Sequence, residues 1–460
     1  MALVERQATQ IIEMAARIAE LEAQLATNSR NSSKPQSSDG YQKPAPKSMR
    51  SKSGKPKGKQ PGAGGKHLEQ VPDPDEIVLH EPEGRCECGC DLAGGELVGV
   101  EARQVFDLPP QRLIVREHRS YRRRCRCGKT SSGRFPAEAT SYASYGPRVR
   151  AMVAYLCVYQ LLPFQRAVEL FADALGVRLA TGSLVGILAE AAKRLGPFTD
   201  AIVGQLKASD VVHYDESGAR VGAKLVWLHS ASTDTLTHYT VHAKRGSEAM
   251  DDAGILPEAT GVAMHDGWAA YRKYDNVTHA ECGAHHLRDL IWVTEHTTQT
   301  WAKDMTDLLL DTKTMVEHAR MRGDPKLEPE QLRAVHWKYA RIIVEAREAN
   351  PPPTPSGKHG RTKKTKQANL LERLDIRRDD VLRFMTDFRV PFDNNLAERD
   401  IRMIKSKQKV SGCFRSPSGA ENFATIRSYV STARKNGRNP LTALTELFNG
   451  NPWIPNPAGT

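Results

Sequence analysis

Residues 209–293 constrain the fold more than any other part of the chain, because strand-like and helix-like patterns follow one another there in a fixed order. Three short apolar segments, SDVVHYDESG, AKLVWLHSAS and LTHYTVHA, are separated only by polar turns. A short helical segment, SEAMDDAGIL, then precedes two further strand-like segments, TGVAMHDGWAAY and VTHAECGAHHLRDLIWV, and the second of these continues into a helix. Three consecutive strands followed by a helix and more strands predict a mixed α/β sheet.

Two aspartates stand at or near the ends of strands in this predicted sheet. Asp215 lies on or just past the first strand, and Asp266 lies at the end of the fourth. Ends of adjacent strands can bring two carboxylates to one edge of a sheet, where repulsion and desolvation disfavour their charges. A divalent cation removes this penalty, and hard cations such as Mg²⁺ prefer oxygen ligands. The pattern therefore predicts a metal site.

A third acid, Glu398, lies in the segment PFDNNLAERDIRMIKSKQKV, which reads as the start of a helix. Asp393 can cap this helix by accepting a backbone N–H bond. Taken alone, Glu398 is better explained by a solvent-facing pair with Arg402 one turn further on, worth about a few tenths of a kcal/mol. The two upstream aspartates shift the balance towards a third metal ligand.

The chain becomes basic directly after Glu398. Between Arg399 and Arg438 there are ten Lys or Arg residues and two acids, and the whole chain carries a net charge of +12. This balance favours a polyanionic partner such as nucleic acid. A channel for DNA phosphates can be lined by this run, although each residue can equally belong to a solvated face; the candidates are Arg399, Arg402, Lys405, Lys407 and Lys409.

Residues 70–140 contain five of the eight cysteines, in the two clusters RCECGCDL and RRRCRCGKT. In a reducing cytosol such clusters more often bind zinc than form disulfides. Two thiolate pairs can close a tetrahedral zinc site, and the alternating sequence between them predicts short strands. The candidate zinc ligands are Cys86, Cys88, Cys125 and Cys127, with Cys90 as a substitute for either of the first two; free thiols are the alternative.

The N-terminal segments predict self-association and a tether. Residues 1–30 carry a seven-residue repeat that predicts a short coiled coil, with a lone amphipathic helix as the alternative. Residues 31–69 are polar and basic, and this composition predicts a disordered linker. The two seams of the repeat are formed by Val4, Ile11, Ile18 and Leu25, and by Gln7, Met14, Leu21 and Asn28.

The remaining segments are helical in pattern. Within residues 141–200 a helix over 164–174, a turn at Gly176 and a helix over 181–195, capped by the Thr181-Gly-Ser cluster, resemble a DNA-binding helix-turn-helix; an ordinary core helix pair is the alternative. Residues 205–290 are expected to contain most of the predicted sheet, and residues 291–389 are expected to be helical with a basic, proline-rich loop. Residues 390–450 contain the Glu398 helix and the C-terminal helices.

Four segments together, HYDESG, HDGWAAY, ECGAHHLRDL and FDNNLAERDIRMIKSKQKVSGCFRSPSGAENFATIRSYVSTARKNGRNP, resemble bacterial insertion-sequence transposases of the sixty-six family (the TnpC type). The resemblance covers nearly the whole chain, from the coiled-coil start and the NSSKPQSSD linker to the acidic core. The cysteine module departs from it, because it has Cys-x-Cys where many relatives have Cys-x-x-Cys.

The resemblance implies a ribonuclease-H-like catalytic domain of the DDE type with a helical insertion. By motif, Asp215, Asp266 and Glu398 form its acidic triad and hold two Mg²⁺ or Mn²⁺ ions, beside a structural Zn²⁺ in the cysteine module. The implied reactions are cleavage of transposon ends at terminal inverted repeats and strand transfer into target DNA. The implied partners are DNA, further copies of the chain and accessory proteins of the same element. Cys282 and His285 match a Cys-x-x-His element that follows the second acid in several such transposases, with an architectural role or a zinc site.

Two other classes of function stay open. A catalytically inactive, transposase-derived DNA-binding protein or regulator would be marked by loss of an acid at one of the three positions. A zinc hydrolase could be assembled from His213, His265, Asp266, His285 and His286. No secretory signal is visible and the longest apolar stretch is too short to span a bilayer, so we expect a soluble, cytoplasmic and nucleoid-associated bacterial protein.

Overall fold

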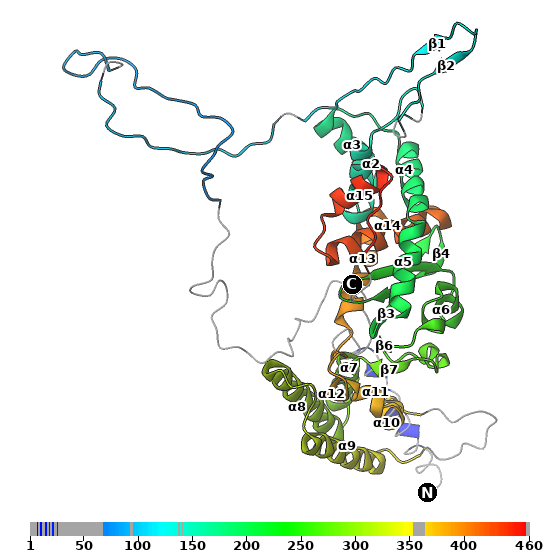
Figure 1. Ribbon diagram of the computed structural model, residues 1–460. Helices are drawn as coiled ribbons and strands as arrows, with labels where there is room; N and C mark the ends of the chain where they lie inside the picture. The colour runs from blue at the N-terminus through cyan, green and yellow to red at the C-terminus, as the bar shows by residue number, and fades with distance from the viewer. Residues whose placement is uncertain are drawn as a thin grey trace.

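The computed structural model describes residues 68–352 and 364–456, except 93–94, 110, 137–138 and 140, together with isolated helical residues between 7 and 25. At the centre of the described part is a five-stranded sheet with the strand order β5-β4-β3-β6-β7. Figure 1 shows this sheet between two groups of helices. The strands are β3 (Val211–Val221), β4 (Lys224–Ser232), β5 (Thr237–His242), β6 (Val262–His265) and β7 (Thr278–Glu281).

The sheet is mixed, as the sequence predicts. Strands β3, β4 and β5 form an antiparallel meander, whereas β6 runs parallel to β3 and β7 runs parallel to β6. The crossover from β5 to β6 contains the short helix α6 (Ser247–Ala253) and a 3-10 turn, η4 (Leu256–Glu258). His213 is paired with Met264, so the same register carried two residues further sets Asp215 opposite Asp266.

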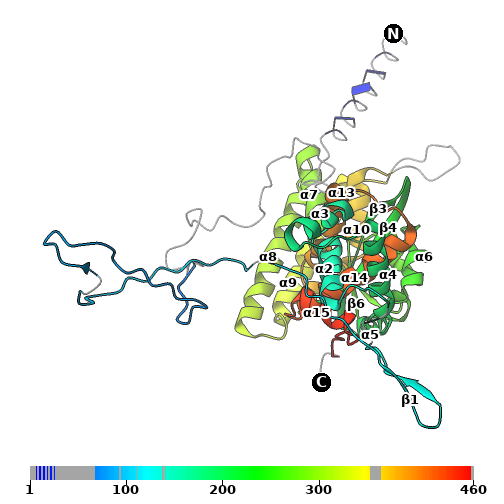
Figure 2. The same ribbon diagram turned by 90° about the horizontal axis from the view of Figure 1, so that it is seen from above.

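One group of helices shares a single hydrophobic core with the sheet. Helix α14 packs along β5, and α13 packs on β3 and β4, which brings the C-terminal part of the chain onto the sheet. Figure 2 shows the helices of this group stacked around the sheet when the molecule is seen from above. The group comprises α2 (Pro147–Ala154), the π-helix η3 (Tyr155–Tyr159), α3 (Phe164–Leu175), α4 (Thr181–Arg194), α5 (Gly196–Lys207), α13 (Asn395–Ser411), α14 (Pro417–Lys435) and α15 (Pro440–Phe448).

The second group of helices has a core of its own and lies at the opposite end of the sheet. It is formed by the chain between β7 and α13, so the described part of residues 291–389 is largely helical, as predicted. The short 3-10 segment η5 (Ala269–Lys273) joins β6 to β7 beside it. The helices are α7 (Gly283–His296), α8 (Trp301–Arg322), α9 (Pro329–Ala349), α10 (Lys366–Ile376), α11 (Arg378–Val381) and α12 (Arg383–Thr386).

Helices α3 and α4 lie where the sequence predicts them, on either side of the turn at Gly176. Gly176 ends α3 with φ of 64°, in the left-handed region where glycine has no Cβ penalty. The predicted cap of the second helix is wrong, because Ala180 is the N-cap residue and no side chain caps α4. Residues 181–183 instead form the first helical turn. Recognition of DNA by this pair stays a prediction.

The region between the cysteine clusters differs from the prediction. A two-stranded hairpin, β1 (Arg122–Arg124) paired with β2 (Thr130–Ser132), encloses the second cysteine cluster. Short strands were expected from residue 102 onwards, but the described residues of 102–121 form none. Their apolar side chains have no surface to cover them: Val105 is 92% exposed and Val115 is 87% exposed. Alternation specifies a strand only where a partner buries one face.

The described residues of the N-terminal repeat are helical and exposed. Ile11, Met14, Ile18, Leu21 and Leu25 all lie on this helix with their side chains in solvent. Pairing of this face with another chain stays a prediction. Val4, Asn28, nearly all of the predicted linker and the tip of the proline-rich loop (353–363) lie outside the described residues. No helix in the described part of the chain is long and apolar enough to cross a membrane.

Candidate catalytic acidic cluster

Asp215 and Asp266 are fixed by backbone contacts on adjacent parallel strands. Asp215 lies within β3, and its Oδ1 accepts the N–H of Glu216 at 2.9 Å. Asp266 directly follows β6, and its Oδ1 accepts the N–H of Trp268 at 2.9 Å. Gly267 allows the turn that follows Asp266, because its φ is 84°. A Cβ added at Gly267 would lie 2.9 Å from a carboxylate oxygen of Glu281. The strand geometry therefore sets the two carboxylates side by side.

The electrostatics of Asp215 report that three other acids lie near it. Burial raises the pKa of Asp215 well above its usual value, and the charges of Glu216, Asp266 and Glu398 raise it further. A buried carboxylate surrounded by like charges is unfavourable in its ionised form. Asp266 and Glu398 are 132 positions apart in the sequence, and the charges of both raise the pKa of the same Asp215 carboxyl group. Asp215, Asp266 and Glu398 therefore lie in one electrostatic neighbourhood, although among the described residues their ligand atoms do not form a group within 4.8 Å of one another.

Glu216 is a fourth acid, which the sequence reasoning overlooked although it directly follows Asp215. Burial and the charge of Asp266 raise its pKa, whereas Arg245 and Tyr271 oppose that rise. Arg245 donates to Oε1 of Glu216 at 2.8 Å through Nε, and the Tyr271 hydroxyl donates to Oε2 at 2.8 Å. The Arg245 guanidinium stacks over the Trp268 ring at 4.1 Å. Glu216 is therefore already neutralised by protein groups, unlike Asp215.

A buried asparagine attaches the Glu398 helix to the sheet. Asn394 is the N-cap residue of α13 and is 1% exposed. Its Nδ2 donates to the carbonyl of Tyr214 at 2.8 Å, and its Oδ1 lies 2.8 Å from Nδ1 of His213. The predicted cap at Asp393 is one residue out, because Asn394 is the N-cap residue, although Asp393 does accept the N–H of Asn395 at 3.1 Å. Because Tyr214 precedes Asp215, this contact holds the first turn of α13 beside the aspartate.

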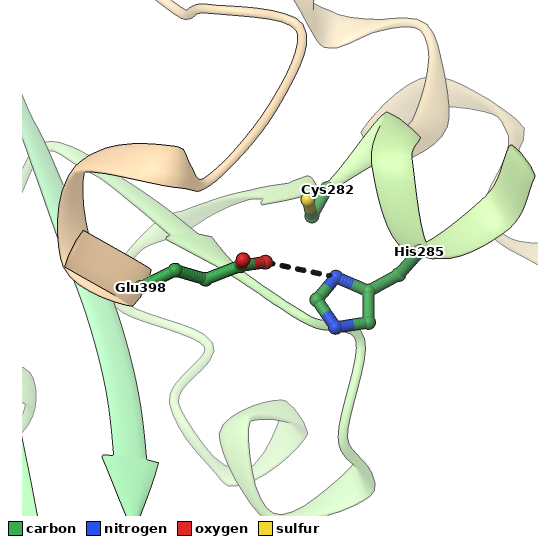
Figure 3. A group of neighbouring side chains, drawn as sticks. All are labelled: Cys282, His285 and Glu398. Carbon is green, nitrogen blue, oxygen red and sulfur yellow. Dashed lines mark ion pairs between the residues drawn. The ribbon is translucent and has the colours of Figure 1, made fainter. Parts of the chain in front are cut away.

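Glu398 lies in that first turn and faces α7. Its Oε1 is 3.7 Å from Nδ1 of His285, and its Oε2 is 3.8 Å from Nη2 of Arg288. Figure 3 shows Cys282 next to this pair, with the three side chains converging from the β7–α7 junction and from α13. Arg288, and not Arg402, is therefore the basic residue that the structure gives Glu398 as an ion-pair partner, and His285 is a further polar contact.

Burial controls the protonation of the two α7-side residues. Burial, followed by the charge of Arg288, lowers the pKa of His285 to about 4, so the imidazole is neutral at physiological pH. Burial, followed by the charge of Glu398, raises the pKa of the Cys282 thiol to about 12. A cation bound to the thiol would favour its deprotonated form.

The histidines considered for a zinc hydrolase do not meet. His213 is bonded to Asn394, His265 stacks on Tyr271 with ring centroids 4.4 Å apart, and His286 pairs with Glu281 at 3.1 Å. Among the described residues, the one group of three or more potential metal ligands consists of Cys282, His285 and Glu398. The geometry thus offers no histidine cluster around Asp266.

The five basic residues after Glu398 divide into two sets. Arg399, Arg402 and Lys409 are exposed on α13. Lys405 donates to the carbonyl of Gly218 at 2.8 Å, and Lys407 is buried. The Lys407 amine donates to the carbonyl of Gly412 at 3.0 Å, and burial lowers its pKa to about 8. Three of the five are therefore available to a polyanion in this conformation, and two are engaged in internal packing.

The two cysteine clusters form matching tight turns. The N–H of Gly89 donates to the carbonyl of Cys86 at 2.7 Å, and the N–H of Gly128 donates to the carbonyl of Cys125 at 2.9 Å. All five thiols of the clusters are exposed. The two turns lie on separate parts of the chain, and no group of three cysteines close enough to share a metal occurs among the described residues.

Comparison with known proteins agrees with this organisation. A model described as the transposase IS66 family matches residues 143–422, and a model for the zinc-finger binding domain of IS66 transposases matches residues 83–128. A family of unknown function matches residues 2–69.

Three proteins of Sinorhizobium fredii, each described as uncharacterized, are similar over most of their length. Protein y4jD is 22% identical over 81% of this chain and 75% of its own length. Protein y4qI is 25% identical over 83% of this chain and 72% of its own, and y4hP is 23% identical over 82% and 73%. Since the family model spans more than half of the sequence, and the acidic cluster and the zinc-finger segment lie within the matched regions, the chain belongs to the IS66 family of transposases.

Proposed function

We propose that this chain cleaves the ends of its transposon and joins them to target DNA, with Asp215, Asp266 and Glu398 as the acidic triad of a divalent-metal site. The observation that carries the proposal is the position of Asp215 on β3 beside the parallel strand β6, which Asp266 directly follows, with Glu398 in the first turn of the helix packed on β3 and β4. Burial and the charges of Glu216, Asp266 and Glu398 raise the pKa of Asp215, as this placement leads one to expect. Without a cation, such a site is unfavourable in its ionised form.

The fold supports this assignment. An antiparallel meander of three strands, followed by two strands parallel to the first, is the arrangement expected for a ribonuclease-H-like core. In the proposal, the first acid comes from the middle of the central strand, the second from the end of the neighbouring parallel strand, and the third from a helix packed on the same sheet. Fold similarity alone does not specify an activity, so the acids are the stronger support.

The donor set fits Mg²⁺ or Mn²⁺. Carboxylate oxygens from three separate elements are the ligands that hard cations prefer, and two or three of them leave positions for substrate oxygens. When bound, such cations activate the attacking oxygen and stabilise the leaving 3′-oxygen of a phosphodiester.

The surrounding residues hold the triad in place. Asn394 fixes the start of the Glu398 helix against Tyr214 and His213. Glu216, held by Arg245 and Tyr271, supports the backbone next to Asp215 while its own charge is balanced. In the proposal DNA lies along the exposed basic residues Arg399, Arg402 and Lys409, whose contacts with phosphates weaken as salt is raised.

The cysteine module supplies a structural zinc site in this proposal, with Cys86, Cys88, Cys125 and Cys127 as ligands. Its two turns have the same backbone hydrogen bond from a glycine to the first cysteine, and each presents thiols to solvent. Binding of one ion to both turns would couple metal binding to folding of residues 83–128.

The proposal is tested with Asp215→Asn, Asp266→Asn and Glu398→Gln. Each variant is expected to lose cleavage of transposon-end DNA and strand transfer by at least about 10³-fold, because each removes a metal ligand. DNA binding in a gel-shift assay should change little. Glu421→Gln, which alters an exposed acid on α14, is the matched control and should retain activity. Retained joining in any triad variant would remove that residue from the triad.

A further inference from the structure

Cys282, His285 and Glu398 converge on one point beside the acidic triad. The Cys282 Sγ, a ring nitrogen of His285 and a carboxylate oxygen of Glu398 all lie within 4.8 Å of one another (Figure 3). Sulfur and imidazole ligands suit Zn²⁺ and related ions, whereas all-oxygen sites suit Mg²⁺. We propose that these three residues bind a thiophilic divalent cation of the Zn²⁺ class, at a site that shares Glu398 with the triad.

The distance between His285 and Glu398 supports a shared ion. Their facing atoms, Nδ1 and Oε1, are 3.7 Å apart, which is too long for a hydrogen bond. Both atoms are buried without a hydrogen-bond partner among the described residues. Two ligands that lie about 2.0–2.1 Å from one tetrahedral ion are roughly 3.3–3.4 Å apart. A small closing movement would therefore satisfy two buried polar atoms with one cation.

The environment of Cys282 supports the same conclusion. Its Sγ accepts the backbone N–H of Asn394 at 3.2 Å, and the residue is 1% exposed. Hydrogen bonds of this kind orient a ligand and stabilise a metal-bound thiolate. Cys282 is the N-cap residue of α7, so His285 follows in the first turn on the same side of the helix.

Arg288 is the group that opposes a cation here. Its Nη1 is 3.4 Å from Nε2 of His285, and its Nη2 is 3.8 Å from Oε2 of Glu398. When Nδ1 of His285 coordinates the ion, Nε2 carries the imidazole proton and cannot accept a hydrogen bond from Arg288. The Arg288 guanidinium therefore has to turn away when the ion binds. Arg288 therefore lowers the affinity of the site for any divalent cation.

Occupation of this site has a consequence for the reaction, and that part rests on the proposed function. A bound Zn²⁺ draws Glu398 towards Cys282 and His285 and away from Asp215 and Asp266. The triad then lacks one ligand for its hard cations. Zn²⁺ is thus an inhibitor that acts through Glu398.

Binding is tested by measuring Zn²⁺ equivalents retained by the full-length protein after gel filtration. Cys282→Ser and His285→Gln should each retain one equivalent fewer than the unmodified chain. Cys413→Ser, which changes an exposed cysteine, should retain the full number. Arg288→Gln should bind Zn²⁺ at this site about tenfold more tightly, because it removes an opposing charge. Equal numbers of equivalents in all four variants would overturn the site.

Two further measurements keep the result unambiguous. Co²⁺ bound to the unmodified chain should give a sulfur-to-metal absorption band, and part of it should be lost in Cys282→Ser but not in Cys413→Ser. Micromolar Zn²⁺ should inhibit Mg²⁺-dependent cleavage by the unmodified chain, and His285→Gln should lose that inhibition relative to its own zinc-free rate. Binding without inhibition would overturn the regulatory role alone. A chain that binds Zn²⁺ but never cleaves DNA would contradict the proposed function and leave the site standing.

Discussion

Asp215 is the residue at which stability and the proposed activity conflict most directly. Its carboxyl is buried within β3, and three neighbouring acids disfavour its charge. Glu216, at the next position, has Arg245 and Tyr271 as partners. In the metal-free fold the repulsion between Asp215 and the neighbouring acids is not compensated. In the proposal, a bound cation compensates it and so raises the free energy of unfolding.

This conflict predicts that Asp215→Asn stabilises the metal-free protein. The amide cannot ionise, and a difference of one pKa unit corresponds to about 1.4 kcal/mol, so a rise in the free energy of unfolding of about 1 kcal/mol or more is expected at pH 7. The same variant should lose most of the increase in Tm that Mg²⁺ gives the unmodified chain. Thermal unfolding with and without Mg²⁺ measures both, with Glu421→Gln as control. An unchanged Mg²⁺ response would separate Asp215 from the metal.

The pH dependence of this effect has a defined sign. The folded-state pKa of Asp215 is raised above its usual value of 3.8, mainly by burial. Its contribution to stability is therefore fully present below pH 3.8 and is lost as the pH rises through the folded-state pKa. The stabilisation of Asp215→Asn relative to the unmodified chain should accordingly grow over that range in metal-free buffer.

At the scale of elements, the contact between α7 and the segment before α13 sets the position of Glu398. The N–H of Gly283 donates to the carbonyl of Phe392 at 2.8 Å, at the first residue of α7. A Cβ on Gly283 would lie 2.4 Å from the Phe392 ring. The first residue of the helix that supplies His285 thus packs directly against the segment that precedes the Glu398 helix.

Gly283→Ala tests this close approach. The ring of Phe392 has to move, and overpacking of this kind costs about 1–3 kcal/mol of unfolding free energy. The shift passes to Asn394 and Glu398, so cleavage activity should fall more than stability alone explains. Gly186→Ala, in α4 with nothing within 4 Å of its added Cβ, should instead stabilise the protein slightly. Urea denaturation and cleavage assays compare the two, and wild-type behaviour of Gly283→Ala would refute the packing argument.

Elements of this protein were largely predictable from sequence, whereas contacts between them were not. The strand-like runs around Val211 and Val262 and the helices on either side of Gly176 follow from local periodicity and turn residues. The exposed run from residue 102 to 121 shows the limit of this reasoning, because apolar alternation without a partner surface gave no strand. The closeness of Cys282 to Glu398 depends on residues more than a hundred positions apart, and no local pattern specifies it.

Across the whole molecule, a buried ion-pair cluster joins the helical insertion to the sheet. Glu281, at the end of β7, has a side chain that is 0% exposed and pairs with Arg272, Arg377 and His286. Arg377 precedes α11 and also donates to the carbonyl of Gly267 at 2.7 Å, next to Asp266. The insertion therefore contacts the residue that directly follows Asp266, the second acid of the proposed triad.

Glu281→Gln should be strongly destabilising. Removing one partner of a buried pair leaves uncompensated charge, and a loss of about 3–5 kcal/mol in the free energy of unfolding is expected. Burial opposes ionisation of Glu281, but His286, Arg377 and Arg272 lower its pKa below the usual 4.5. Its stabilisation is therefore present above pH 4.5 and is lost as the pH falls through the folded-state pKa, so the difference between the two proteins should shrink in acid.

Urea denaturation at pH 7 and at lower pH measures this difference. Glu317→Gln, which removes an exposed pair with Lys313 on α8, is the matched control and should change stability by less than about 1 kcal/mol. A similar small effect for Glu281→Gln would mean that the cluster does not couple the insertion to the sheet.

The hydrogen bond between Gly283 and Phe392 closes the insertion at its base. The chain departs from the sheet and returns to it at the same point, and Arg320 on α8 also holds the returning segment by donating to the carbonyl of Val390 at 3.1 Å. Helix α9, further out on that detour, could be lengthened, shortened or replaced in related elements while the geometry of the proposed triad is inherited unchanged. The number of residues between Asp266 and Glu398 is therefore a poor measure of relatedness within this family. The two short segments around Gly283 and Phe392 are a better one.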